Sequence, residues 1–548
     1  MTEVNMPSMG GFRGGPAGRP QDRFSPKEKA KDARGTLRRL ISFYLSEGKS
    51  LLLAFALLLA DTVITVLVPR AVGLTVDAIS AGKSINAFVA ALIGAYALSW
   101  LLNIAQGVIM NAASQRIVRS LRKGLFDKLQ RLPLTYHDTH THGELMSRLT
   151  NDVDNISITI AQSTTQLASA VITLAGTFAM MCSLNLALTG AALVTVPCVV
   201  ILTRIIAGFA RRLFLAQQRA LGQLNGIIEE TIAGQKIVKA FHMENKTIER
   251  FSVVNDELCN AAARAQIRSG GLMPLMMIIT NLGYLCVAAL GGVLIIRGSV
   301  TVGVVASFLT YTRAFAMPMN NVAGTFNNLQ AALAGAERVF EVLAEADEPA
   351  DPPDAVPMSN PLGGVRFENV RFAYTPGVDI LKGVSFTVAA GQKVALVGET
   401  GAGKTTVANL ISRFYDVTSG AVYIDGEDIR RYRRDDLRQA FSVVLQDTCL
   451  FTGTIADNIR YGRPEATDAE VREAARAGGS YEFIARLRDG FDTVVSGDSE
   501  TLSQGQRQLL SISRAALCKA PILILDEATS SVDTRTERAI QAAMLRLQ

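Results

Sequence analysis

The sequence predicts a multidomain chain in which an all-α membrane domain of six helices precedes an α/β domain with a helical subdomain. The first observation is composition, since 49% of the 548 residues are apolar and 19% are charged, whereas soluble chains carry about 25% charged residues. The second is that the apolar residues gather in long stretches between residues 51 and 320. The third is that short β-rich runs alternate with helical runs from Val365 onward, as in α/β sheet domains.

Composition and charge also exclude several classes of protein. So apolar a chain cannot be disordered throughout. The net charge is +6, but the basic residues lie between apolar stretches and form no stripe interleaved with aromatic side chains, so no nucleic-acid partner is expected. The six cysteines include no CxxC pair, which argues against a disulfide scaffold and common zinc motifs. We expect them to be reduced thiols.

The N-terminal region is predicted to contain a tail and a surface helix. Residues 1–26 are rich in Gly, Arg and Pro and contain no apolar run, which predicts a disordered tail and no cleavable secretory signal. Residues 27–49 are basic and amphipathic, so a helix lying along the cytoplasmic membrane surface is expected.

Six apolar stretches are long enough to cross a bilayer as helices of about 20 residues. They are residues 51–69, 85–110, 158–181, 186–207, 272–296 and 300–320. The second and fourth connections between them are long, basic and helical in pattern, so the helices are expected to continue beyond the bilayer. The positive-inside rule places these connections, the N-terminus and the C-terminal third in the cytoplasm of a multi-pass protein of the cell membrane.

The charged residues Asp61 and Arg313 lie well inside predicted spans. A charge at the centre of a span costs about 2.5–3.5 kcal/mol, so each needs a reason to be there. One alternative is that they face a polar pathway between the helices. The other is that they form an interhelical pair or extend toward the membrane surface.

The domain boundaries follow from shifts in composition. The membrane domain is expected over residues 27–328. An acidic, proline-containing linker is expected over residues 329–364, and a nucleotide-binding domain over residues 365–548.

A phosphate-binding loop is predicted at residues 398–405. An apolar strand is expected at residues 393–397 and a helix after the loop, which is the setting that the G-x-x-x-x-G-K-[ST] motif requires. The loop glycines let backbone N–H groups surround the phosphates of ATP, Lys404 supplies a positive charge, and Thr405 supplies a hydroxyl for Mg²⁺. The residues expected to bind ATP here are Gly398, Glu399, Thr400, Gly401, Ala402, Gly403, Lys404, Thr405 and Thr406.

A second apolar strand is predicted at residues 521–525, directly before Asp526 and Glu527. Polar residues at the carboxyl end of a buried parallel strand commonly carry the chemistry of an α/β sheet. Asp526 is therefore expected to hold Mg²⁺, and Glu527 to act as the general base toward the attacking water.

A third motif, residues 502–506, is predicted to open a helix. It reads Leu502, Ser503, Gln504, Gly505 and Gln506. The serine could serve as a helix N-cap, and the helix start could equally bind an anion.

These motifs, in this order, resemble those of ATP-binding cassette (ABC) exporters in the half-transporter arrangement, from about Leu37 to the last residue. The resemblance implies that residues 502–506 are the family signature, in which Ser503 and Gly505 contact the γ-phosphate of ATP held by the opposite subunit. It also implies that Tyr374 stacks on adenine and that Asp533 lies in a loop crossing the dimer interface.

The same resemblance assigns Gln446 to Mg²⁺ and the attacking water, and residues 134–154 and 229–239 to two segments that couple the membrane domain to the nucleotide domains. It implies ATP-driven export or flipping of an amphipathic small molecule or lipid by a dimer of two half-transporter chains, identical or different. An alternative is an ATP-binding regulatory half that needs a different, active partner chain. An importer is disfavoured because both domains are fused in one chain.

The sequence departs from the family pattern at two places. Gln504 stands where the family most often has glycine, which we expect to matter little. The switch histidine of the family has no counterpart, because all four histidines precede residue 243. We therefore expect an incomplete nucleotide domain that binds ATP weakly and hydrolyses it poorly. Three of those histidines, His137, His140 and His142, are expected to lie in a solvated turn rather than a metal site.

Overall fold

The computed structural model describes residues 32–446, 448–496, 502–526 and 534–547. Its contacts divide the chain into two units. The membrane unit comprises residues up to 131 together with residues 140–345, and the nucleotide unit comprises residues 132–139 together with residues from 346 onward. The predicted tail, residues 1–26, lies outside the described residues.

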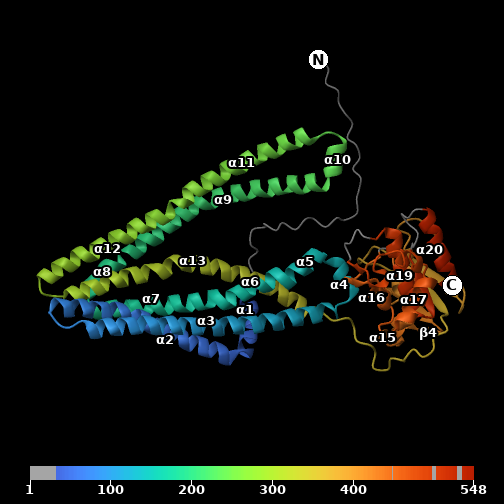
Figure 1. The fold of residues 1–548 in the computed structure, drawn as a ribbon, viewed down its shortest axis with the longest axis horizontal. Coiled ribbons are helices and arrows are strands. Elements are labelled where there is room, and N and C mark those ends of the chain that lie inside the picture. Colours follow the sequence, from blue (N-terminus) through green and yellow to red (C-terminus); the bar gives the residue numbers. More distant parts are fainter. Residues whose placement is uncertain (1–31, 447, 497–501, 527–533, 548) are drawn as a thin grey trace, which may run out of the picture. The chain divides into compact units, whose positions relative to one another are not determined.

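The membrane unit consists of helices lying side by side (Figure 1). Its N-terminal helices are α1 (Ala33–Ser46), α2 (Gly48–Ser80), α3 (Asn86–Leu129), α5 (His142–Ser147), α6 (Val153–Ile158) and α7 (Thr164–Leu184), with π-helical turns η1 (Arg148–Asp152) and η2 (Thr159–Ser163) on either side of α6. The others are α8 (Leu186–Leu193), α9 (Thr195–Ala233), α10 (Gln235–Ala240), α11 (Glu244–Gly270), α12 (Leu272–Ile296) and α13 (Val302–Ala344).

Each of the six predicted apolar stretches lies within these helices apart from residue 85, residue 194 and residues 300–301, which confirms the helical fold of this part of the chain. Among the described residues, four helical runs are long and apolar enough to cross a membrane: Gly48–Ser80, Asn86–Leu129, His142–Leu184 and Glu244–Ile296.

The helices also continue well past the apolar stretches, as predicted. α3 extends beyond residue 110 to Leu129, which adds about 29 Å at 1.5 Å per residue. α9 continues to Ala233, and α11 runs back beside it, with α10 at the turn between them (Figure 1). α13 continues to Ala344, into the segment where a linker was expected, and the membrane unit ends at Glu345.

Polar contacts join helices that are distant in the sequence. Arg338 in α13 donates two hydrogen bonds to the buried carboxylate of Asp152 in η1, from Nε to Oδ2 at 2.9 Å and from Nη2 to Oδ1 at 2.5 Å. Near the start of α13, Asp77 of α2 accepts a hydrogen bond from the backbone N–H of Gly303 at 2.7 Å and one from the Thr301 hydroxyl at 2.8 Å. These carboxylates fix α13 against η1 and α2.

The structure favours one of the two alternatives for Asp61. The Ser99 hydroxyl of α3 donates a hydrogen bond to the Asp61 carboxylate of α2, so this residue forms an interhelical pair. Arg313 is exposed on α13.

The described residues of the nucleotide unit form three small sheets. β1 (Val365–Phe372), β2 (Leu381–Val388), β3 (Ser419–Ile424) and β4 (Glu427–Asp428) form an antiparallel sheet in the order β2-β1-β3-β4. β5 (Phe441–Val444) pairs in parallel with β8 (Ile522–Leu525), and β6 (Gly453–Thr454) pairs with β7 (Val494–Val495). The β-rich pattern predicted from Val365 onward is confirmed.

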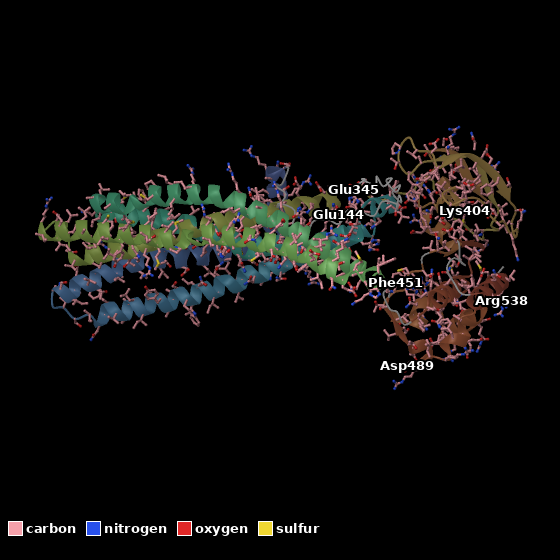
Figure 2. All side chains as sticks on the ribbon, turned by 90° about the horizontal axis from the view of Figure 1, so that it is seen from above. Glu144, Glu345, Lys404, Phe451, Asp489 and Arg538 are labelled. Atoms are coloured by element: carbon pink, nitrogen blue, oxygen red, sulfur yellow. The ribbon has the colours of Figure 1, made fainter. Side chains whose placement is uncertain are left out.

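The helices of this unit pack in two main groups. α14 (Lys404–Ile411) packs Val407 and Leu410 against the antiparallel sheet. The helical subdomain packs α16 (Ile455–Arg460), α17 (Asp468–Ala477) and α18 (Tyr481–Ile484) against α19 (Gln504–Cys518). The remaining helices of the unit are α4 (Leu134–Thr139), α15 (Arg434–Gln439), α20 (Thr534–Leu547) and the short turns η3 (Ile429–Arg431) and η4 (Gly490–Asp492). In Figure 2, Lys404 lies in one lobe of this unit and Asp489 at the edge of the other.

The strand predicted at residues 393–397 is wrong as a regular element. Residues 392–399 form no strand, and the side chain of Val397 is 94% exposed. A strand exists through hydrogen bonds to a neighbour, and within the described part of the chain no strand pairs with this segment. The apolar sequence therefore forms no regular element here.

Candidate nucleotide site

The predicted phosphate-binding loop has the backbone that its glycines allow. Gly401 and Gly403 have φ values of 88° and 89°, a left-handed region that favours glycine. A Cβ atom on Gly403 would also lie 2.8 Å from Cδ2 of Leu381. The loop then passes directly into α14, whose first residue is Lys404. Its N–H groups and the start of α14 thus lie together, as an anion site requires.

The charged group of this loop is held by the loop itself. Lys404 Nζ donates hydrogen bonds to the carbonyl oxygens of Gly398, at 2.8 Å, and Glu399, at 2.9 Å. The ammonium group therefore closes the loop on the same side as its glycines. A positive charge held at this place can attract the phosphate groups of a nucleotide.

Two predicted magnesium ligands, far apart in the sequence, meet in the structure. The Thr405 hydroxyl, in the first turn of α14, donates a hydrogen bond to Oδ1 of Asp526 at 3.2 Å. Asp526 follows β8 directly, and its backbone N–H donates to the carbonyl of Val444 at 3.0 Å, so strand pairing fixes its position. A hydroxyl and a carboxylate are oxygen donors of the kind that Mg²⁺ prefers, and the residues fit that ion.

Tyr374 lies beside the same helix. Its side chain is 43% exposed. Its hydroxyl donates to Oγ1 of Thr406 at 3.3 Å and accepts from Nδ2 of Asn409 at 3.3 Å. These two contacts hold an accessible aromatic ring next to α14, where a nucleotide base could stack on it.

The signature segment confirms the N-cap expectation. Ser503 caps α19, with its hydroxyl accepting from the backbone N–H of Gln506 at 3.3 Å. In return, Gln506 Oε1 accepts from the backbone N–H of Ser503 at 2.9 Å. Leu502 is buried, Gln504 is the first helical residue, and Gly505 is buried in the first turn. This capping box fixes the start of α19 rigidly.

Other predicted site residues are placed only in part. Gln446 is exposed two residues after the end of β5. Glu527 and Asp533 lie outside the described residues. Within the described part of the chain, no group of three His, Cys, Asp or Glu side chains is arranged to hold a metal.

Sequence reasoning missed an aromatic cluster that adjoins the site. The ring of Tyr415 packs at a right angle to that of Tyr374, with ring centroids 5.0 Å apart, and also contacts Phe372 at 5.6 Å. Its hydroxyl donates a hydrogen bond to the carboxylate of Asp138 in α4. No motif marks Tyr415. The signal would have been two aromatic residues, Phe414 and Tyr415, just after the end of the predicted phosphate-binding helix.

The two predicted coupling segments differ in their surroundings. Of the first, residues 134–139, which form α4, belong to the nucleotide unit, where Tyr136 is buried, and residues 140–154 belong to the membrane unit. By contrast, α10 belongs to the membrane unit, and the apolar side chains of Ile237 and Phe241 are 65% and 73% exposed.

Comparison with known proteins gives the family. Residues 51–319 match the ABC transporter transmembrane region, and residues 381–530 match the ABC transporter nucleotide domain. An uncharacterised ABC transporter ATP-binding protein of Bacillus subtilis is 42% identical over 95% of this chain and 87% of its own length. A fatty acid ABC transporter ATP-binding/permease protein of Mycobacterium tuberculosis is 44% identical over 83% of this chain and 72% of its own.

A solved structure is similar over both units. A bacterial Atm1-family ABC exporter with ATP bound matches with a TM-score of 0.70 and 31% identity, over 91% of this chain and 88% of that one. The two matched regions follow one another in the predicted order, and the chain belongs to the ABC transporter family, as an exporter half-transporter whose nucleotide domain binds ATP and whose ATPase is coupled to transport.

Proposed function

We propose that two copies of this chain form an exporter that uses ATP and Mg²⁺ to move a fatty acid or a similar amphipathic lipid across the cytoplasmic membrane. The substrate class is supported by the Mycobacterium tuberculosis relative, which is named as a fatty acid transporter. The predicted spans, with their long apolar helices, suit a substrate with an acyl chain.

The contact between Thr405 and Asp526 carries the catalytic part of this proposal. It joins the phosphate-binding loop to the end of β8 across 121 residues of sequence. Thr405, Asp526 and Gln446 would hold Mg²⁺, which when bound neutralises charge on the phosphate oxygens. Glu527, directly after Asp526 in the sequence, would accept a proton from the attacking water as the general base.

The signature helix supports the pairing of two copies. The capped start of α19 offers backbone N–H groups and the Ser503 hydroxyl for an anion. The phosphate-binding loop of the same chain already surrounds its own phosphates, so Ser503 and Gly505 would bind the γ-phosphate held by the other copy. Asp533 would lie in the loop that crosses between the two copies.

We expect the two coupling segments to contact nucleotide domains of different copies. α4 would transmit motion from the nucleotide unit that it belongs to, because Tyr136 and Asp138 are already engaged there. α10 presents exposed apolar side chains at the turn between two long helices, and would dock on the nucleotide domain of the other copy. Nucleotide-driven closure would then move the helices of both.

Transport by the purified chain alone is the direct test. The full-length protein is reconstituted in proteoliposomes, and ATP-dependent movement of a fluorescent fatty acid is compared with that of a fluorescent phospholipid. We expect movement of the fatty acid that stops in Lys404→Ala. Movement of the phospholipid alone would contradict the substrate class. An intact dimer that binds ATP but moves neither lipid would favour a regulatory half that needs a different partner.

A further inference from the structure

The segment after α14 links the nucleotide site to the coupling helix α4. The chain leaves α14 through Arg413, which has a φ of 50°, and this left-handed residue reverses the chain so that Tyr415 returns toward β1. Tyr415 is 9% exposed, inside the core beneath the antiparallel sheet. The turn therefore places a tyrosine in contact with the ring of Tyr374.

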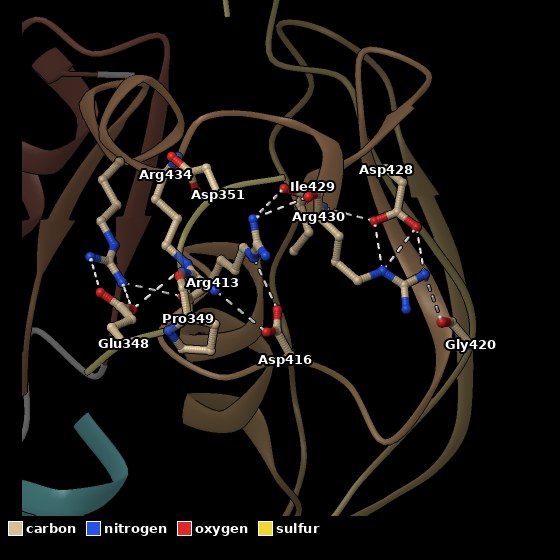
Figure 3. A network of polar contacts seen from close by, with 11 residues as sticks. Glu348, Pro349, Asp351, Arg413, Asp416, Gly420, Asp428, Ile429, Arg430 and Arg434 are labelled. Carbon is tan, nitrogen blue, oxygen red and sulfur yellow. Dashed lines mark hydrogen bonds and ion pairs between the residues drawn. The ribbon is translucent and has the colours of Figure 1, made fainter. Parts of the chain in front are cut away.

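A network of polar contacts holds this turn in place (Figure 3). The buried guanidinium of Arg413 donates from Nε to Asp416 Oδ1 at 3.0 Å and from Nη1 to the carbonyl of Ile429 at 3.2 Å. Arg438 donates from Nη2 to the Arg413 carbonyl at 3.4 Å and forms an ion pair with Glu348 at 2.5 Å. Because these contacts come from several elements, residues 413–416 form a fixed support rather than a free loop.

Tyr415 contacts both Tyr374 of the candidate nucleotide site and Asp138 of α4. Its ring meets that of Tyr374 at 90°, with centroids 5.0 Å apart, and Phe372 completes the cluster at 4.8 Å from Tyr374. Its hydroxyl donates to the Asp138 carboxylate of α4. Burial, and next the adjoining Asp138, raise the pKa of the Tyr415 phenol above its usual range, so the phenol keeps its proton and remains the donor.

We propose that Tyr415 is a positioning residue, which holds the Tyr374 ring in the orientation for base stacking and passes a change in that ring to α4 through Asp138. The inference rests on the proposed ATP site, since it gives Tyr374 its base-stacking role. It predicts two separable effects of Tyr415. The aromatic ring of Tyr415 affects the affinity for ATP. Its hydroxyl affects how much substrate is transported per ATP hydrolysed.

The test uses the full-length chain in proteoliposomes, with ATPase and transport measured on the same preparation. Tyr415→Leu removes the aromatic ring and should raise the KM for ATP about fivefold, as expected for the loss of one aromatic contact. Tyr415→Phe keeps the ring and removes the hydroxyl, so it should raise KM less but lower the transport per ATP hydrolysed severalfold. Asp138→Asn should lower the same ratio.

Tyr432→Phe is the matched control. Tyr432 is also buried in this core, and its hydroxyl donates to the Ile424 carbonyl at 3.2 Å, away from Tyr374. Its removal should change neither KM nor the coupling ratio. If Tyr415→Phe behaves like Tyr432→Phe, the link to α4 is wrong.

A double-mutant cycle separates this inference from the proposed function. If Tyr415 acts through Tyr374, then Tyr415→Leu should add little to the KM of Tyr374→Ala. Fully additive effects would overturn the positioning role while leaving the ATP site intact. If Tyr374→Ala alone leaves KM unchanged, base stacking at Tyr374 fails, and this inference fails with it.

Discussion

The two units of the chain use polar groups in different ways. At the candidate ATP site of the nucleotide unit, polar groups of short motifs meet, where Thr405 contacts Asp526 and Ser503 caps α19. In the membrane unit, single carboxylates join elements that are distant in the sequence, such as Asp152 with Arg338 and Asp77 with Gly303. The difference teaches that changes in the motifs should alter ATP turnover at nearly constant stability, whereas changes in the anchors should alter stability at nearly constant ATP affinity.

The largest expected effect lies in a motif of the nucleotide unit. Glu527→Gln removes the proposed general base and keeps the shape of the side chain, so ATPase turnover should fall at least about 100-fold while ATP still binds. Steady-state turnover and nucleotide binding on the full-length chain measure both. Glu473→Gln, at an exposed position of α17, is the control and should keep full turnover. Turnover near the wild-type level in Glu527→Gln would refute its role.

A buried anchor of the membrane unit should give the next largest effect. Asp152→Asn weakens the ion pair with Arg338, whose side chain is 35% exposed while the Asp152 side chain is 5% exposed. The free energy of unfolding should fall by about 2 kcal/mol, less than for a fully buried pair. Asp154→Asn, two residues away, weakens an exposed pair with Arg122 and should cost at most about 0.5 kcal/mol. Thermal unfolding compares the two, and equal losses would contradict the anchoring role.

A close helix crossing should give a smaller effect. A Cβ atom on Gly303 would lie 2.0 Å from the carbonyl oxygen of Gly73, so Gly303→Ala should separate α2 from α13 and cost about 1–2 kcal/mol. Gly292→Ala, in α12, meets nothing within 4 Å and should be neutral or stabilising. The melting temperatures of the two variants decide the matter. Neither variant should change the KM for ATP. A changed KM in Gly303→Ala would contradict the expectation that this contact in the membrane unit affects stability and not ATP affinity.

The smallest effect depends on pH. Hydrogen bonds from Thr454 lower the pKa of the Asp457 carboxyl in the capping box of α16. A lowered pKa means that the carboxylate stabilises the fold above its unfolded pKa of about 3.9, and that this contribution is lost as the pH falls through the folded pKa. Asp457→Asn should therefore be less stable at pH 7, by at most about 0.5 kcal/mol because the group is exposed. The difference should shrink as the pH falls below the unfolded pKa and through the lowered folded pKa, and a difference independent of pH would exclude this origin.

The sequence was sufficient to predict those features that consist of residues adjacent in the chain. The phosphate-binding loop, the acidic strand end and the signature each consist of a few neighbouring residues whose chemistry is specific, and the six apolar stretches are long enough to identify. Pairings between distant residues could not be predicted. Nothing in the sequence joins Tyr415 to Asp138 or Asp152 to Arg338, because these contacts depend on how helices cross. The strand predicted at residues 393–397 is wrong for a related reason, because an apolar pattern does not show whether a neighbouring strand will pair with it.

A complementation experiment tests the central claim, that the signature of one copy completes the ATP site of the other. In a Glu527→Gln background, Lys404→Ala and Ser503→Arg are made in separate chains and then co-expressed with different tags, and ATP retained by doubly purified dimers is measured. A mixed dimer has one site that combines an intact phosphate-binding loop with an intact signature from the other chain. The account predicts that mixed dimers retain ATP while neither variant does so alone. Mixed dimers that retain no more ATP than the separate variants would contradict it.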